Sequence, residues 1–187
     1  LSTRCSQLLR RTSQNLREGW LRLRYICSFN VTNTVGFCQQ SSEFSRHMPL
    51  PKIALAQINM LVGGVNQNIE KIITFATEAA EQLEADLVVF PELAVTGYPP
   101  EDLLLRPGFL ELSNQGVEQL LDLSHQIALL FGAPRMTENG LRNCALLLTN
   151  GKIQEEYSKY ELPNYSVFDE KRYFAAGSAP CVFDFSG

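Results

Sequence analysis

Short apolar runs and one segment of helical period alternate in the region that begins at residue 48. The run Lys52–Asn59 (KIALAQIN) predicts a buried strand. After a turn at Gly63-Gly64, apolar residues recur at helical spacing over 69–83, and Asn66 is the expected N-cap of that helix. Asp86–Pro91 (DLVVFP) predicts a second strand that is covered on both faces. This strand–helix–strand order predicts a right-handed parallel crossover.

The chain continues with an irregular loop and a second helix. Gly97-Tyr98-Pro99-Pro100 forces the loop, and a short turn at Glu101–Leu105 is broken by Pro107. An amphipathic helix is expected over Phe109–Leu123, followed by a strand over Ile127–Ala133.

The last third of the chain predicts a hairpin, a long loop and a final strand. Cys144–Thr149 and Ile153–Tyr157 flank Asn150-Gly151, which is the strongest short hairpin signal. Leu162–Gly177 has turn residues and no clear period, whereas Pro180–Phe185 has the pattern of a strand. The whole region therefore predicts an α/β domain with helices over a mixed sheet.

Charge divides the chain near His47. Hydrophobic residues make up 45 % and charged residues 19 % of the 187 residues, as in ordinary globular proteins. Residues 1–47 hold seven Arg and two Glu, while residues 48–187 hold nine basic and eighteen acidic side chains. An acidic body argues against nucleic acid as a partner. Because no run of eighteen apolar residues occurs, we expect no membrane span.

Three interpretations of residues 1–47 remain open. This segment is rich in Ser and Arg and poor in acids, as an organellar transit peptide is. Leu9–Ile26 could instead form a basic amphipathic helix on a partner or membrane surface. The third interpretation is a leader that is non-native or disordered, with Met48 as the true start of a domain over 48–187.

Cysteine usage favours a reducing, cytoplasmic location. Of the five cysteines, only Cys144 and Cys181 lie beyond residue 47, and no CxxC occurs there. This spacing predicts neither a disulfide framework nor a zinc site, so we expect no bound metal.

Two charged residues follow directly on predicted strands. Glu92 lies just past the second strand, where α/β sheets bind their ligands, and a Glu desolvated there has a raised pKa that suits a general base. Lys159 follows the hairpin and could stabilise an oxyanion. Each of them, like Glu170 in the mixed-charge run 168–172, could also be an ordinary solvated residue.

Two longer segments carry a family resemblance. VVFPELAVTGYPPEDLLLRPGFL (Val88–Leu110) and YSKYELPNYSVFDEKRYFAAG (Tyr157–Gly177) resemble the nitrilase, or carbon–nitrogen hydrolase, superfamily. Within it they resemble the glutamine-amidotransferase domain of glutamine-dependent NAD synthetases, and the resemblance covers essentially all of 48–187. It implies a nitrilase-like α-β-β-α sandwich, of which the chain would hold the front portion only.

The resemblance also implies roles for individual residues. Glu92 matches the general base, Lys159 the oxyanion-stabilising lysine, and Glu170 a second, supporting glutamate. Tyr165 is the candidate contact for the substrate, L-glutamine. The implied reaction is amide hydrolysis that supplies ammonia for ATP-dependent amidation of deamido-NAD. ATP and magnesium would belong to a synthetase domain outside this chain, with no cofactor in the chain itself, and the full-length protein would form a homo-oligomer.

One element of the family pattern is absent from the sequence. The family's nucleophilic cysteine lies in a Cys-Glu-Asp triplet, and residues 1–187 contain none. Cys144 and Cys181 are expected to be packing residues, and His125 a residue near a helix end. We therefore expect a truncated chain that is inactive alone and folds poorly. The alternatives are a stand-alone amidase or nitrilase, and a non-catalytic interaction module that pairs with intact subunits.

Overall fold

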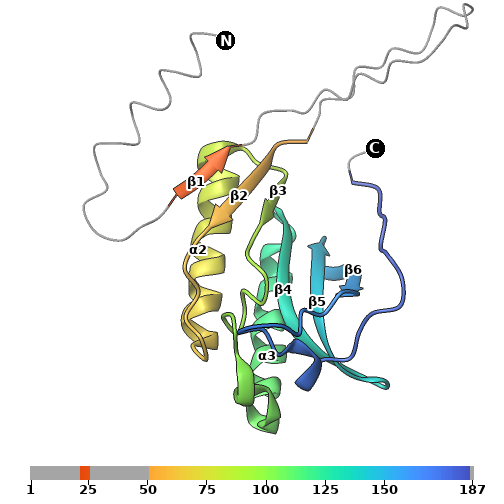
Figure 1. The fold of residues 1–187 in the computed structure, drawn as a ribbon. Coiled ribbons are helices and arrows are strands. Elements are labelled where there is room, and N and C mark those ends of the chain that lie inside the picture. The colour runs from red at the N-terminus through yellow and green to blue at the C-terminus, as the bar shows by residue number, and fades with distance from the viewer. Residues whose placement is uncertain (1–21, 26–50, 186–187) are drawn as a thin grey trace, which may run out of the picture.

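The computed structural model describes residues 22–25 and 51–185, which form a six-stranded sheet with two α-helices against it (Figure 1). The strands lie in chain order across the sheet: β1 (Arg22–Tyr25), β2 (Ile53–Gln57), β3 (Leu87–Val89), β4 (Ala128–Thr137), β5 (Gly140–Thr149) and β6 (Lys152–Ser158). The pairs β2–β3 and β3–β4 are parallel, and the other neighbours are antiparallel. The predicted mixed α/β sheet is confirmed.

The two α-helices cover one face of the sheet. α2 (Val65–Leu83) and α3 (Pro107–Leu123) lie side by side (Figure 1). Their apolar stripes pack with the strands into the main core, in which Ile72 and Leu120 are fully buried. Burying such a side chain stabilises the fold by roughly 2–3 kcal/mol.

The start of α2 differs from the expectation. The helix begins at Val65 with Gly64 as its N-cap and no side-chain cap, so the prediction of Asn66 as the cap is wrong. The buried Asn68 instead ties down the preceding turn. Its side-chain oxygen accepts from Leu61 N, and its amide nitrogen donates to the carbonyls of Leu61 and Val95. These hydrogen bonds to residues outside the helix, rather than a local cap, fix the start of the helix.

The segment before α3 contains the expected short turn, a 3-10 helix η1 over Glu101–Leu105. Pro107 is the first residue of α3. A proline is well suited to that position, because the first N–H of a helix has no intrahelical acceptor.

The β5–β6 hairpin turns through Asn150 and Gly151, both with positive φ, as predicted. A second hairpin joins β4 to β5 at Glu138-Asn139, and it extends both strands well beyond the predicted ranges.

The chain after the hairpin covers the opposite face of the sheet. It forms a long loop, interrupted only by the 3-10 helix η2 (Glu170–Arg172). The strand predicted over Pro180–Phe185 does not form. Phe183 and Phe185 instead pack their rings on a small cluster of Leu87, Ala128 and Leu147, so side-chain burial replaces ladder hydrogen bonding there.

Strand β1 lies within the predicted leader and pairs antiparallel with β2. Residues 22–25 are therefore extended, which contradicts a continuous helix over 9–26. The rest of segment 1–47 and Met48 lie outside the described residues. In the part of the chain that is described, no helix combines the length and apolarity needed to cross a bilayer.

Candidate active site

Three charged side chains predicted from the sequence meet at one point. Lys159 Nζ lies 2.7 Å from Glu92 Oε1 and 2.9 Å from Glu170 Oε1. Glu92 lies on the loop after β3, Lys159 directly follows β6, and Glu170 opens η2. The fold thus brings three residues from distant segments into direct contact.

A glycine in β4 allows the backbone of Glu92 to approach the sheet. A Cβ at Gly132 would collide with the backbone of Glu92 and Leu93. Leu93 itself has φ of 47°, in the left-handed region, and Val95 N then donates to Gly132 O. The chain therefore turns sharply just after Glu92 and holds it at the end of β3.

Backbone hydrogen bonds on both sides fix Lys159. Its N–H donates to the carbonyl of Asn143 on β5 (2.8 Å), and its own carbonyl accepts from Gly177 N (2.8 Å). A Cβ at Gly177 would strike the carbonyl of Ser158, so the loop can approach so closely only at a glycine.

Glu170 is the buried member of the three. Its side chain is 6 % exposed, and Oε1 accepts from Tyr98 OH (2.9 Å) as well as from Lys159. Glu170 Oε2 is buried and has no hydrogen-bond partner among the described residues. One oxygen of this carboxylate is thus held by two donors, and the other is left without one.

The surroundings favour a charged Lys159. Burial by itself lowers the pKa of Lys159, but the hydrogen bonds to Glu92 and Glu170 outweigh it and raise the pKa above its ordinary value. Burial and the hydrogen bond to Glu170 raise the pKa of Tyr98. At neutral pH the site therefore holds a cation beside a neutral phenol that donates a hydrogen bond.

The predicted desolvation of Glu92 is wrong. Its side chain is 45 % exposed, because it lies on a loop beyond the end of the strand rather than inside the sheet. The contacts that hold it are two hydrogen bonds to Oε1, from Lys159 and from Asn143 Nδ2 (2.7 Å). Hydrogen bonding, and not burial, is thus what the fold supplies to this carboxylate.

Two residues of the site were not singled out from the sequence. Tyr98 lies inside the segment that carries the family resemblance but has no predicted role. Asn143 directly precedes Cys144 in β5, and strand alternation could have indicated it, since the two side chains point to opposite faces.

Tyr165 connects to this cluster through a row of aromatic rings. It is 68 % exposed and packs edge-on against Phe168, with ring centroids 5.6 Å apart. Phe168 lies 6.5 Å from the ring of Tyr98. Tyr165 therefore ends an aromatic row that begins at the hydroxyl bound to Glu170.

Neither described thiol reaches the charged cluster. Cys144 is buried on the helix-covered face, where its Sγ lies near Glu156 and Ser158, and burial raises its pKa to about 11. Cys181 Sγ lies 3.8 Å from Glu155. The structure thus brings Glu92, Lys159 and Glu170 together and leaves both cysteines apart from them.

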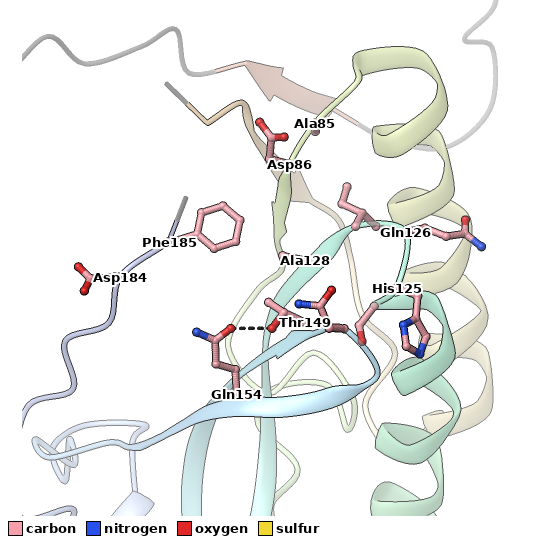
Figure 2. A pocket seen from close by; sticks show the side chains of 12 residues that line it. Ala85, Asp86, His125, Gln126, Ala128, Thr149, Gln154, Asp184 and Phe185 are labelled. Carbon is pink, nitrogen blue, oxygen red and sulfur yellow. Dashed lines mark hydrogen bonds between the residues drawn. The ribbon is translucent and has the colours of Figure 1, made fainter. Parts of the chain in front are cut away.

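A separate hollow lies at the other end of the sheet (Figure 2). It has a volume of about 440 Å³ and is lined by residues at the starts of β3 and β4 and at the β5–β6 turn, with His125, Thr149 and Gln154 among them. None of Glu92, Lys159 and Glu170 lines it. Among residues 22–25 and 51–185, no group of three or more His, Cys, Asp or Glu side chains is placed to hold a metal ion.

Comparison with known proteins assigns the chain to a family. The model of the carbon-nitrogen hydrolase family matches residues 52–187. The glutamine-dependent NAD(+) synthetase of Xylella fastidiosa is 45 % identical over 138 residues, which is 73 % of this chain and 25 % of the relative. The chain therefore spans about a quarter of the length of the curated relatives it matches.

Two solved structures, like the sequence relatives, are similar to this chain. Glutamine-dependent NAD+ synthetase from Acinetobacter baumannii matches 71 % of this chain and 25 % of its own, with a TM-score of 0.68 and 41 % identity. An amidase from Nesterenkonia sp. matches 72 % of this chain and 51 % of its own, with a TM-score of 0.62 and 26 % identity. That amidase has an active-site cysteine.

Proposed function

Because this chain belongs to the carbon–nitrogen hydrolase family, we propose that Glu92, Lys159 and Glu170 form part of the active site of a glutamine amide hydrolase. The observation that carries the proposal is the position of Lys159 Nζ, within 2.9 Å of both carboxylates. A cation held between two carboxylates, one of which follows the parallel strand β3, has the chemistry and the place that amide hydrolysis requires.

Each group has a defined task in the proposed reaction. An amide has a poor leaving group, so a thiolate attacks its carbonyl carbon and forms a covalent intermediate. Glu92 takes the thiol proton and returns it to the departing ammonia, while Lys159 stabilises the negative oxygen of the tetrahedral intermediate. Glu170 holds Lys159 in place. Water then hydrolyses the glutamyl thioester and regenerates the thiol.

The nucleophile is assigned to a cysteine other than Cys144 and Cys181. Cys144 is buried on the helix-covered face of the sheet, and burial raises its pKa. Cys181 contacts Glu155 rather than the charged cluster. The active-site cysteine of the Nesterenkonia amidase supports a thiol mechanism. The family's Cys-Glu-Asp triplet would supply that thiol from outside residues 1–187.

The proposal extends to the role of the ammonia. Relatives named glutamine-dependent NAD(+) synthetase are about four times as long as the matched region, which leaves room for a second domain. In that domain ATP and magnesium would drive the amidation of deamido-NAD, and no described residue is assigned to them. Tyr165 is proposed to contact glutamine at the end of the aromatic row. A cytoplasmic homo-oligomer is the proposed form of the full-length protein.

The second candidate is a stand-alone amidase, which the likeness to the Nesterenkonia enzyme favours. The assay that separates the two supplies the full-length protein with L-glutamine or with a simple aliphatic amide and measures ammonia. It also measures NAD formed from deamido-NAD and ATP. We expect L-glutamine to be the better substrate and to support NAD formation. Preference for the aliphatic amide, with no NAD formed, would overturn the synthetase assignment and leave the amidase.

A further inference from the structure

Asn143 touches both of the proposed catalytic residues. Its side chain is buried at 4 % exposure, and Nδ2 donates to Glu92 Oε1 at 2.7 Å. Its backbone carbonyl accepts from Lys159 N at 2.8 Å. One residue of β5 therefore sets the position of the base with its side chain and that of the cation with its main chain.

The two oxygens of Glu92 are not equivalent. Oε1 accepts from both Asn143 Nδ2 and Lys159 Nζ, each at 2.7 Å, and a carboxylate oxygen has two lone pairs for such bonds. No hydrogen bond from the described part of the chain reaches Oε2. Oε1 is thus fully engaged, and Oε2 is the oxygen with capacity to accept a proton.

Without the amide, the carboxylate of Glu92 would have considerable freedom. Its side chain is 45 % exposed, and the last torsion of a glutamate has no sharp preference. Lys159 alone cannot fix it, because the same ammonium also bonds to Glu170. A neutral amide orients the carboxylate without adding a charge beside it.

We propose that Asn143 is a positioning residue, which binds Glu92 Oε1 so that Oε2 is the oxygen that receives and returns the proton. This inference rests on the proposed function, in which Glu92 is the general base. The titratable groups that face Glu92 are Lys159 after β6, Tyr98 on the loop after β3, and Glu170 through Lys159. The amide of Asn143 is the only uncharged donor among the described residues that bond to Glu92.

The test measures kcat, KM and the pH profile of ammonia release from L-glutamine by the full-length protein. In Asn143→Ala we expect kcat to fall by about 10- to 100-fold, which is the loss of rate expected when a general base is present but misplaced. KM should be nearly unchanged. Asn143→Asp keeps the shape but sets a second carboxylate beside Glu92. Since a like charge raises the pKa of a carboxyl group, the acidic limb of its profile should move to higher pH.

A matched control is Asn114→Ala on α3. Asn114 is half-buried and, like Asn143, is hydrogen-bonded to a charged residue, in this case Arg135, but on the helix-covered face of the sheet. It should retain the normal kcat and pH profile. If Asn143→Ala unfolds, the position of the acidic limb in the pH profile of the isosteric Asn143→Asp variant tests the inference instead.

The inference is overturned if both Asn143 variants keep the normal kcat and acidic limb while Glu92→Gln abolishes activity, which leaves the proposed function intact. If Glu92→Gln itself retains full activity, the proposed function fails and the role of Asn143 fails with it. Thermal unfolding of each variant, compared with that of Asn114→Ala, separates lost positioning from lost fold.

Discussion

At the scale of single residues, the sharing of Lys159 between two carboxylates controls its charge. The hydrogen bonds to Glu92 and Glu170 raise its pKa against the effect of burial. The stabilisation from these contacts is fully present below the ordinary pKa of a lysine, about 10.4, and is lost as pH rises through the raised value. Because the side chain is 26 % exposed, solvent weakens this contribution.

Removing the charge of Glu170 should lower the pKa of Lys159. In Glu170→Gln, burial continues to lower that pKa while one opposing carboxylate is gone. The alkaline limb of the pH profile for ammonia release by the full-length protein should therefore move to lower pH. Glu161→Gln, at an exposed position of the same loop, serves as the control and should leave the limb in place. An unchanged limb in Glu170→Gln would mean that Glu170 does not act on Lys159.

Cys144 should be nearly inert towards alkylation in the folded protein. Its thiol is buried and its pKa is raised to about 11, so iodoacetamide at pH 8 should modify it far more slowly than the partly exposed Cys181, whose pKa is also raised but whose sulfur the reagent can reach. Peptide mass spectrometry of the two sites measures the ratio, and denatured protein, in which both react, provides the control. Equal labelling of both sites in the folded protein would contradict the placement of Cys144.

At the scale of elements, the site depends on a close approach between β4 and the Glu92 loop. In Gly132→Ala, the new methyl group would collide with the backbone at Leu93 and push Glu92 away from Lys159. A shift of about 1 Å in a catalytic group can lower the rate by about 100-fold, so we expect a loss of that order in kcat. Kinetics of ammonia release with the full-length protein provide the measurement.

The matched control is Gly108→Ala in α3, where a Cβ would meet no atom within 4 Å. This change should leave kcat unaltered and stabilise the helix by up to about 1 kcal/mol, because alanine has the higher helix propensity. A normal kcat for Gly132→Ala would show that the loop can relax, and that the glycine does not position Glu92.

The spacing of hydrophobic residues predicted most helices and strands. It failed where contacts between distant segments determine the local structure. The strands β2 to β6 and both helices follow from local apolar patterns and turn residues. The cap of α2 does not, because Asn68 bonds to Leu61 and Val95 only after the loop has folded over the helix. Likewise Phe183 and Phe185 have a strand pattern, but burial against Leu147 satisfies them without a strand.

Prediction of the site had a similar limit. Glu92 and Lys159 could be placed because both follow predicted strands, and the family resemblance added Glu170. The contact between Asn143 and Glu92 depends on the register of β5 and on the path of a loop that starts two strands away. Neither is encoded in a local pattern. The exposure of Glu92 was missed for the same reason.

At the scale of the whole molecule, the proposed chemistry lies at one end of a mixed sheet. The helices cover one face, aromatic residues of the C-terminal segment cover part of the other, and the hollow lined by His125, Thr149 and Gln154 lies at the far end (Figures 1 and 2). The three charged residues come from segments up to 78 positions apart, Glu92 to Glu170, so the site exists only when the sheet has formed.

The most direct test of this site is the replacement of Lys159. Ammonia release from L-glutamine is measured for the full-length protein with Lys159→Gln and, as the control, with Lys152→Gln at an exposed position on β6. Loss of the cation that holds the oxyanion should lower kcat by about 100-fold or more, with circular dichroism unchanged and with normal activity in the control. Normal ammonia release by a folded Lys159→Gln variant would contradict the assignment of Glu92, Lys159 and Glu170 as the active site.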